Sequence, residues 1–477
     1  MKEKYLTDYL VRNAAETGAK TAVDFEGQTI SWQELWQRVE PLSYFISREL
    51  GPAKQAVVAI LMPNSIDFII TYMAVLHSGH IALPLDPAYK KLELDAIIGQ
   101  LPPKLLVCDS STVQQVSGSY RPVIFEDIIG QKADKQPLLR LDPARQVASM
   151  TFTSGTTGQP KAVPNTHSNH LWNIKVCSEV WEWTDKDSLL VCVPLSHMLG
   201  SVMGLSGALY HGNTIYLQRW FNESETLRAL SSGKVTFFSH AASAYVKLVQ
   251  AENKDYDLSA VRLCVSGAAP LPPAIWQEFK RRFGIEIIET YGTTETGRIA
   301  ANRLGQPVLG SPGQVLPEVD FKLSETGEVL IKSPGVFPGY YQNPEATAES
   351  RTKEGYWRTG DTAEIKDGNI HLKGRVQERI RRYGYTVSPR DVEWAVHKHP
   401  KVKDIYVMGR QAEGQPSDEL VYFVAGDITD GELKIFCKAN LLFAWRPDKI
   451  IHLEELPRTR SGKPKIAKLK QMAENQS

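Results

Sequence analysis

Apolar positions along the chain switch between helical spacing and short continuous runs. One group recurs every three or four residues and is followed by Gly79, which predicts a helix that ends there. Its members are Ile66, Ile69, Ile70, Met73 and Leu76. The apolar run 81–85 comes next and predicts a buried strand. Such a helix-to-strand step indicates an α/β fold.

A second α/β unit is predicted further along the chain. The run 261–265 predicts a buried strand, and Ile275, Phe279 and Phe283 then share one face of a helix that stops at Gly284. A further strand is expected at 285–288. Two strands around one helix imply a right-handed parallel crossover, and ligands bind at the carboxyl ends of such strands. The segments after Val265 and Ile288 are therefore candidate site walls.

The pattern changes twice in the last third of the chain. Between residues 298 and 373 glycine and proline are frequent and the elements are short, which predicts small antiparallel structure such as a distorted β-barrel. After Gly374, Ser388 and Pro389 mark a helix start, and 405–408 and 420–425 predict strands. We expect a large N-terminal domain over 1–375, with parallel-rich sheets, helices and the small barrel, and a smaller C-terminal α/β domain over 376–477.

Composition narrows the possible functions. The chain has 477 residues, 42% of them hydrophobic and 23% charged, as in a globular protein. Lys and Arg number 55 against 54 Asp and Glu, so no overall field favours nucleic acid or an anionic membrane. The most apolar stretch, 57–85, is broken by Pro63 and Asp67 before it reaches the length of a membrane span. We therefore expect neither a nucleic-acid partner nor a membrane span.

The termini and cysteines favour a cytoplasmic location. Residues 1–13 carry both acidic and basic side chains and lack the pattern of a signal peptide. The five cysteines are far apart, without the spacing of a zinc or redox pair, so we interpret them as reduced thiols.

The segment from Thr153 to Lys161 is a candidate phosphate loop. It holds four hydroxyl residues and two glycines beside one lysine, so its backbone N–H groups can surround phosphate oxygens. Its spacing differs from that of the nucleotide-hydrolase loop, because two residues rather than four separate Gly155 from Gly158. A flexible surface turn is the alternative.

Seven motifs in order resemble those of the acyl-adenylate-forming superfamily, which includes acyl- and aryl-CoA synthetases. The motifs are Thr153 to Lys161, Pro194 to Gly200, Ser266 to Pro270, Tyr291 to Glu295, Thr359 to Asp361, Gly374-Arg375 and Pro457 to Lys463. This resemblance spans nearly the whole chain. It implies an enzyme that joins a carboxylic acid to AMP, using ATP and Mg²⁺, and then forms a thioester with coenzyme A.

The resemblance also assigns roles to particular residues. Tyr291 would stack on adenine, Asp361 would accept the ribose hydroxyls and Glu295 would hold Mg²⁺, which favours carboxylate oxygen. Each alone has a plainer interpretation, such as a core aromatic or a turn former. The positions assigned to the nucleotide are Thr153, Ser154, Gly155, Thr156, Thr157, Gly158, Lys161, Gly267, Ala268, Ala269, Tyr291, Gly292, Thr294, Asp361, Arg375 and Lys463.

Three residues are the candidates for acting on the reacting groups. Lys463 would come from the small domain to the carboxylate and α-phosphate, Thr294 would contact the α-phosphate, and His197 would border the acid. Amino-acid-activating relatives usually have aspartate where this chain has His197, so an amino-acid substrate is not expected. A packed core histidine is the alternative. The small residues of 200–208, with Ala242, predict an apolar pocket or, alternatively, close helix packing.

The acceptor is expected to be coenzyme A. Arg382, Gly384 and Tyr385 lie in a basic segment that resembles the family's pantetheine tunnel, although a solvated face is the alternative. The resemblance also implies that the C-terminal domain is mobile about a hinge near Gln377, where many relatives have aspartate or lysine. Two other functions stay open: an adenylation enzyme that loads an acyl carrier protein, and a non-enzymatic nucleotide-binding relative.

Overall fold

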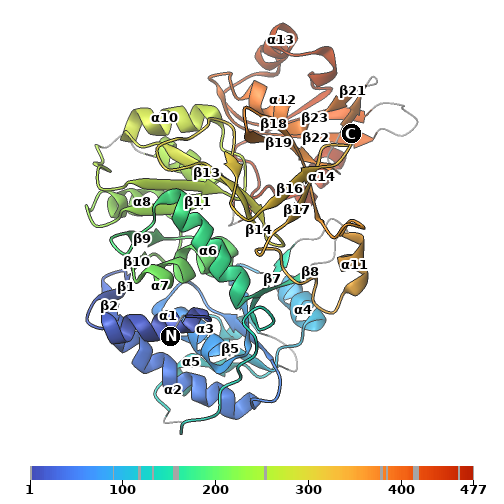
Figure 1. Ribbon diagram of the computed structural model, residues 1–477. Coiled ribbons are helices and arrows are strands. Elements are labelled where there is room, and N and C mark those ends of the chain that lie inside the picture. The colour runs from blue at the N-terminus through green and yellow to red at the C-terminus, as the bar shows by residue number, and fades with distance from the viewer. Residues whose placement is uncertain are drawn as a thin grey trace.

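The protein is seen here as a computed structural model. It describes residues 3–89, 91–116, 120–131, 134–153, 161–251, 255–376, 380–382, 385–411, 418–459 and 462–475. In these ranges the strands form two large sheets and three small ones. The early part of the chain lies at the lower end of Figure 1 and the C-terminal part at the upper end.

The first large sheet has the strand order β6-β5-β3-β4-β7-β8 in the described ranges. Every residue of β3 and β4 is buried, as expected for parallel strands covered on both faces. The strands are β3 Val57–Leu61, β4 Ile81–Leu85, β5 Leu105–Cys108, β6 Val123–Ile124, β7 Val147–Thr153 and β8 Lys161–Thr166. Helix α3 (Ile66–Ser78) starts at Ser65, whose side chain accepts from Phe68 N, and ends at the left-handed Gly79. This helix-to-strand step is confirmed.

The second large sheet has the order β15-β14-β13-β12-β11-β9-β10-β1-β2 among the described strands. Its strands are β1 Thr21–Phe25, β2 Gln28–Ser31, β9 Ser188–Val191, β10 Thr214–Leu217, β11 Phe237–Ala241, β12 Leu263–Gly267, β13 Ile287–Thr293, β14 Gly297–Ala301 and β15 Gln314–Val315. The predicted crossover is present, since β12 and β13 are parallel and α10 (Pro273–Phe283) joins them. Both strands begin two residues later than predicted. The apolar residue Val261, where the strand was predicted to start, is buried but precedes the first residue of β12.

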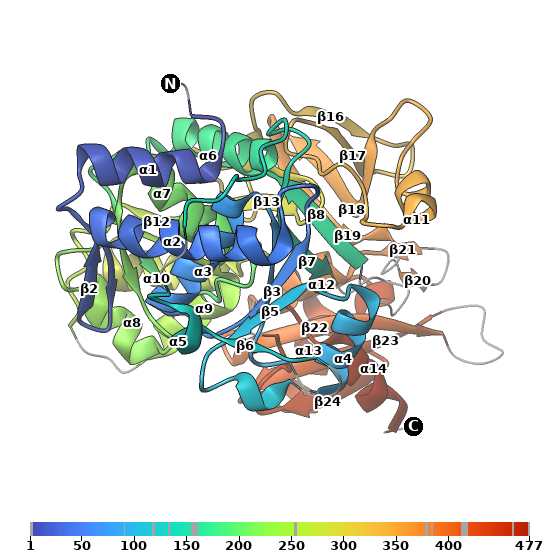
Figure 2. The same ribbon diagram turned by 90° about the horizontal axis from the view of Figure 1, so that it is seen from below.

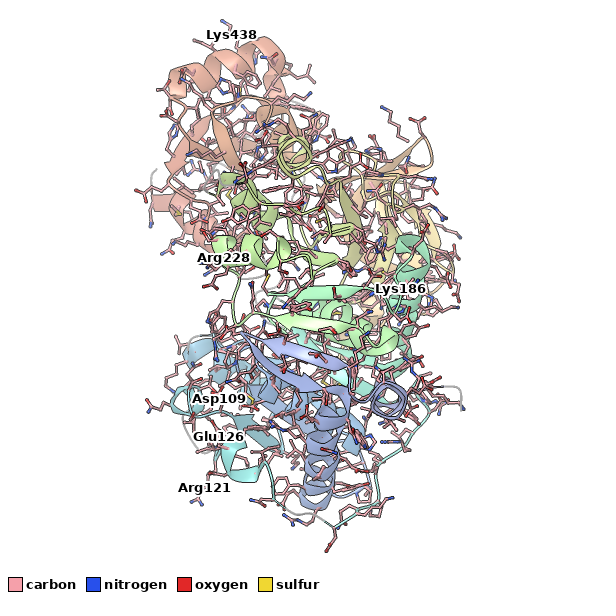
Figure 3. The ribbon with its side chains drawn as sticks, turned by 90° about the vertical axis from the view of Figure 1, so that its left-hand side faces the viewer. Asp109, Arg121, Glu126, Lys186, Arg228 and Lys438 are labelled. Atoms are coloured by element: carbon pink, nitrogen blue, oxygen red, sulfur yellow. The ribbon has the colours of Figure 1, made fainter. Side chains whose placement is uncertain are left out.

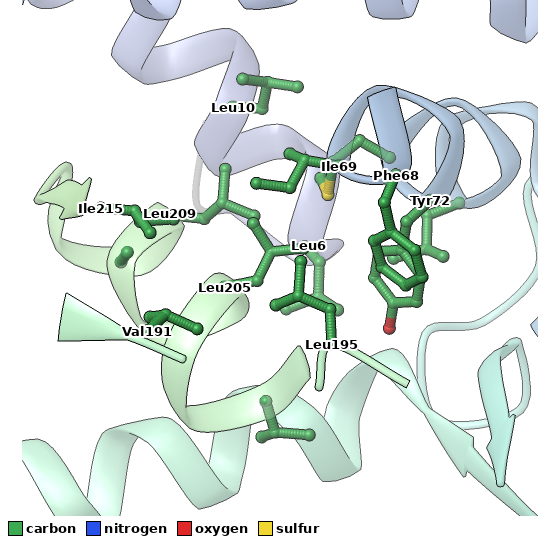
Figure 4. Close-up of a cluster of buried hydrophobic side chains, with 14 of the residues drawn as sticks. Leu6, Leu10, Phe68, Ile69, Tyr72, Val191, Leu195, Leu205, Leu209 and Ile215 are labelled. Atoms are coloured by element: carbon green, nitrogen blue, oxygen red, sulfur yellow. The ribbon is translucent and has the colours of Figure 1, made fainter. Parts of the chain in front are cut away.

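The main hydrophobic core unites the two large sheets. Side chains from β3, β9, β10 and β12 join those of α1, α2, α3 and α6 in one buried cluster. Figure 4 shows part of it, where Leu6 and Leu10 of α1 face Leu205 and Leu209 near Val191 of β9. Figure 2 shows α1 and α2 lying across this region. The helices up to this point are α1 Leu6–Glu16, α2 Trp32–Leu50, α4 Lys91–Gln100, α5 Phe125–Ile128, α6 His167–Trp181, the π-helix η2 Leu199–Ser206, α7 Gly207–His211, α8 Glu223–Leu230 and α9 Ala242–Gln250.

A small antiparallel sheet follows, as the glycine-rich stretch predicted. Its order is β16-β17-β18-β19, with the half-barrel character expected for this part of the chain. The strands are β16 Asp320–Leu323, β17 Glu328–Lys332, β18 Trp357–Lys366 and β19 Asn369–Arg375, and α11 Pro344–Glu349 lies between β17 and β18 in the chain. The register pairs Asp361 of β18 with Arg375 of β19.

The C-terminal region has a core of its own. Strands β22, β23 and β24 form a sheet in which alternate residues of β23 face opposite sides. Leu420, Tyr422 and Val424 pack with α12 and α13, while Val421 and Phe423 pack with α14. The elements are β20 Ile380–Arg382, β21 Tyr385–Val387, α12 Pro389–Val396, β22 Val402–Gln411, β23 Asp418–Gly426, α13 Asp430–Asn440, β24 Lys449–Leu453 and α14 Ile466–Asn475. Ser388 caps α12 as predicted. The exact domain boundary stays a prediction.

Charged side chains cover the surface. Figure 3 shows Arg121, Arg228, Lys186 and Lys438 at the outer edges of widely separated parts of the molecule. A search of the described residues finds no helix with the length and apolar character needed to cross a membrane.

Candidate active site

Tyr291, Asp361 and Arg375 form the centre of the candidate site. The Tyr291 hydroxyl donates to Asp361 Oδ2 at 2.8 Å, and Arg375 Nε lies 2.8 Å from Asp361 Oδ1. Burial raises the pKa of Asp361, while the Arg375 charge and the Tyr291 hydrogen bond oppose that rise. Three residues that are far apart in the sequence therefore meet through β13, β18 and β19.

The turn after β12 forms a wall beside this cluster. Ala268 has φ 63°, a left-handed conformation that costs energy for a residue with a side chain. Across from it, a Cβ on Gly292 would lie 2.1 Å from Gly297 O, so only glycine fits where β13 meets β14. The predicted residues Gly267, Ala268, Ala269 and Gly292 thus occupy a tightly shaped surface.

Glu295 and Lys161 both contact Tyr340. The Tyr340 hydroxyl donates to Glu295 Oε1 at 3.2 Å, and Lys161 Nζ is 4.9 Å from the centre of the Tyr340 ring. Thr294 precedes Glu295 in a turn that the hydroxyl-to-hydroxyl hydrogen bond of Thr293 and Thr296 holds. No cluster of three or more metal-binding side chains occurs among the described residues. One carboxylate suffices for Mg²⁺ that is bound mainly by phosphates and water.

Lys463 reaches this cluster from the C-terminal region. Its turn is closed by Thr459 N, which donates to Lys463 O at 2.7 Å, and by Lys463 N, which donates to Thr459 Oγ1 at 3.1 Å. Burial and the Arg375 charge lower the pKa of Lys463, whereas Glu295 and Asp361 raise it. By its solvent accessibility, however, Lys463 is an exposed residue, so the effect of burial on its pKa is small. The lysine therefore lies within electrostatic range of Arg375, Glu295 and Asp361.

Gly462 docks this turn on the large sheet. Its φ is 83°, and a Cβ there would lie 2.4 Å from Ser243 Oγ and 2.9 Å from Ala241 Cβ. Ala241 is the last residue of β11, and Ser243 lies at the start of α9. Arg458 braces the turn from behind, because its Nη1 donates to Gly462 O at 3.0 Å and its Nη2 lies 2.8 Å from Asp404 Oδ2.

His197 has a neighbour that the sequence analysis missed. Its Nε2 is 3.4 Å from Oδ2 of Asp86, a buried carboxylate that also accepts from Ala88 N. A carboxylate therefore does lie beside His197, although not at its position in the sequence, and the expectation that amino acids are not substrates stays a prediction. Asp86 follows β4 directly, so the rule that sites gather at strand ends could have found it.

Several predicted residues lie outside the described ranges or have an unexpected setting. Ser154, Gly155, Thr156, Thr157, Gly158, Gln377 and Gly384 are outside the described residues, as are the side chains of Thr153 and Tyr385. Arg382 is buried, with its guanidinium 2.7 Å from Asp448 Oδ1 and bonded to Arg446 O. The alternative of a solvated face does not hold for Arg382, because β20 turns this side chain towards the core of its own region, and its role in binding coenzyme A stays a prediction.

A second contact between the two regions was also missed. Glu289 of β13 accepts from Leu271 N at 3.3 Å and is electrostatically coupled to Arg390, at the start of α12. Burial raises the pKa of Glu289 to about 7, although Arg390 and the amides of Leu271 and Gly310 oppose this rise. Nothing local in the sequence indicates that residues about a hundred positions apart would meet.

The cysteines are free and buried. Burial raises the pKa of Cys108, Cys177, Cys192 and Cys264 to about 12 and that of Cys437 to about 11. These thiols therefore behave as small apolar side chains.

Comparison with known proteins identifies the family. Residues 10–341 match the AMP-binding enzyme family and residues 391–463 match the AMP-binding enzyme C-terminal domain. The 2-succinylbenzoate–CoA ligase of Listeria monocytogenes serotype 4b is 28% identical, covering 98% of this chain and 99% of its own. The long-chain-fatty-acid–CoA ligase of Bacillus subtilis is also 28% identical, covering 97% and 93%.

A solved structure agrees with these matches. ATP-bound MatB from Rhodopseudomonas palustris has a TM-score of 0.89 at 25% identity, covering 98% of each chain. The matched segments include Lys161, Tyr291, Glu295 and Lys463, whereas Asp361, Arg375, Arg382 and Arg390 lie between the two segments. The chain belongs to the AMP-binding enzyme family.

Proposed function

We propose that Tyr291, Asp361, Arg375 and Lys463 bind ATP and a carboxylic acid in the arrangement that makes an acyl-adenylate. The chain is an ATP-dependent acid–thiol ligase, which forms acyl-AMP with release of pyrophosphate and then transfers the acyl group to coenzyme A. The observation that carries the residue assignment is the meeting of Lys463 with Arg375, Glu295 and Asp361 across the two regions.

The residues carried by β13, β18 and β19 suit a nucleotide. The Gly267 to Ala269 turn ends β12, which pairs with the strand β13 that carries Tyr291, so the base would bind between this turn and the Tyr291 ring. Asp361 already has two donors in Tyr291 and Arg375, and a carboxylate has enough lone pairs to accept ribose hydroxyls as well. Thr294 and Lys161 would contact the phosphates, and Glu295 would hold Mg²⁺, which neutralises phosphate charge.

Lys463 supplies positive charge to the acid and the α-phosphate. Attack by the carboxylate develops negative charge on the α-phosphate oxygens, and a donor already positioned there lowers the barrier. Its pKa is lowered but it lies beside two carboxylates, which favour the charged ammonium. The hairpin that seats Gly462 against Ala241 fixes how deeply the lysine enters.

A panel of acids tests this function. Pyrophosphate release is measured with ATP, Mg²⁺ and fatty, aryl and amino acids, each with and without coenzyme A. We expect release with non-amino acids and acyl-CoA formation only when coenzyme A is present. Release with no acid in the panel would refute the residue assignment, and stimulation by amino acids alone would refute the interpretation of His197.

The acceptor and location can be refined further. We infer that free coenzyme A, rather than a carrier protein, is the physiological acceptor, because the relatives above are named CoA ligases. Transfer to a carrier protein faster than to coenzyme A would reverse this inference. The five free cysteines favour a reducing compartment such as the cytosol, which cell fractionation tests.

A further inference from the structure

Arg298 is a buried cation that the reaction described above does not use. It lies on β14, and its Nη1 is 3.5 Å from the place where a Cβ on Gly267 would stand. Its backbone N donates to Asn173 Oδ1 on α6 at 2.7 Å, which fixes the point from which the side chain extends. The guanidinium therefore lies against the end of β12, on the side of the sheet that faces α6.

No partner for this charge is found among the described residues. Neither an ion pair nor a side-chain hydrogen bond joins the Arg298 guanidinium to any of them, and burial lowers its pKa with only the Cys177 thiol opposing. The side chain nevertheless keeps some access to solvent. A desolvated cation without a protein partner is costly, so such groups are found where a ligand supplies the opposite charge.

Arg298 and Lys463 lie at opposite ends of one short path. The Lys463 turn rests on Ala241, because a Cβ on Gly462 would lie 2.9 Å from Ala241 Cβ. Ala241 pairs with Gly267 on the next strand, which is about 4.8 Å away. Gly267 then borders the Arg298 guanidinium. The Lys463 turn and the Arg298 guanidinium therefore lie against the ends of the neighbouring strands β11 and β12.

The space on the η2 side of β11 is small, which favours a short acid if the acid extends in that direction. Between η2 and strands β9 and β11 the protein encloses a cavity of about 10 Å³, lined by Leu199, Met203, Gly204 and Ser239. That is room for about one water molecule. The buried Ser239 hydroxyl has no hydrogen-bond partner and adds a polar group to this wall. An extended alkyl chain does not fit here without movement of η2.

We infer that Arg298 determines specificity by binding a second carboxylate of the substrate, so that the enzyme activates a short dicarboxylic acid. This inference rests on the proposed function and narrows its substrate class. The two ends of the acid would have different fates, since one carboxylate reacts under Lys463 while the other forms an ion pair with the guanidinium.

Matched pairs of acids test the inference. Pyrophosphate release is measured for straight-chain diacids from succinate to suberate and for monoacids of equal carbon number. We expect kcat/KM to favour one diacid over its matched monoacid by about 10²-fold, because the monoacid leaves Arg298 unpaired. If monoacids are preferred throughout, the inference fails and the proposed function stands. If no acid supports release, the proposed function fails.

Variants separate recognition from a structural role. Arg298→Met keeps the length of the side chain without its charge, and we expect the ratio of diacid to monoacid kcat/KM to fall about 10²-fold, mainly through KM. Arg298→Lys should restore part of the ratio. The exposed Arg303→Met is the matched control and should leave the ratio unchanged. An equal loss for both acids, or a selective rise in the KM for ATP, would overturn the assignment.

Discussion

The two sides of the active site are held in different ways. On the nucleotide side, Asp361 joins Tyr291 of β13, in the large sheet, to Arg375 of β19, in the small antiparallel sheet, by a hydrogen bond and an ion pair. On the C-terminal side, the Lys463 turn is held from its own region by Thr459 and the Arg458–Asp404 ion pair. Its link to the large sheet is the contact of Gly462 with Ser243 and Ala241.

This difference separates binding from chemistry. The nucleotide side is preorganised by strands that share one core, whereas the lysine is carried by a region with a separate core. Contacts that depend on docking can be broken without unfolding either region. Substitutions of Tyr291, Asp361 or Arg375 should therefore affect ATP binding. Substitutions in the lysine turn should affect the first half-reaction.

Removal of the lysine should have the largest effect. Lys463→Ala is expected to slow acyl-adenylate formation by about 10² to 10³-fold, because it removes the donor at the developing charge. Thioester formation from supplied acyl-adenylate should be kept. Single-turnover assays of each half-reaction check this, with the exposed Lys465→Ala as control. Equal loss of both half-reactions would contradict the assigned role.

The contact between the two regions should give a pH-dependent effect. The pKa of Glu289 is about 7 in the folded protein against an ordinary value of 4.5, so folding favours the protonated form. Its contribution to stability is therefore greatest at low pH and falls by about 3 kcal/mol as the pH rises from about 4.5 to 7. Glu289→Gln should remove this fall, as urea unfolding at pH values on either side of that window would show.

The matched control for this prediction is Glu349→Gln, an exposed glutamate on α11. It should leave the pH dependence of the unfolding free energy as in the wild type. A Glu289→Gln variant that follows the wild-type pH dependence would show that Glu289 is ionised normally.

The nucleotide side should respond through ATP affinity. Asp361→Asn weakens both the Arg375 ion pair and the carboxylate that accepts the Tyr291 hydroxyl, so KM for ATP should rise about 10 to 100-fold. Tyr291→Phe keeps the ring and loses one hydrogen bond, so its effect should be smaller. Initial rates at varied ATP measure both. A fall in kcat with unchanged KM would place Asp361 in the chemical step instead.

The smallest effect is expected from the brace behind the lysine. Arg458→Ala removes the bond to Gly462 O and the Asp404 ion pair, which should slow acyl-adenylate formation about 10-fold. Arg410→Ala breaks an ion pair with Glu419 in the same region, away from the turn, and serves as control. Identical rates for the two variants would mean that the turn needs no brace.

The sequence predicts local structure well here and long-range meetings poorly. Helix α3, its end at Gly79 and strand β4 could be predicted directly, because the spacing of apolar residues in the sequence matches the residues that are buried. The order of the motifs identified Tyr291, Asp361 and Lys463 as one site. Tyr340 beside Glu295 and Arg390 near Glu289 were missed, since each depends on how separate elements pack and leaves no local signal. Asp86 beside His197 was missed although its place directly after a predicted strand was a signal.

The buried cysteines have a consequence for an enzyme that handles an activated acyl group. A thiolate is a competing nucleophile for any acyl-adenylate or thioester, but Cys177, Cys192 and Cys264 are enclosed and their raised pKa keeps them protonated. The protein thus protects its own product from capture by its own side chains. A cysteine introduced on the Lys463 turn could be labelled selectively, without removing the native ones.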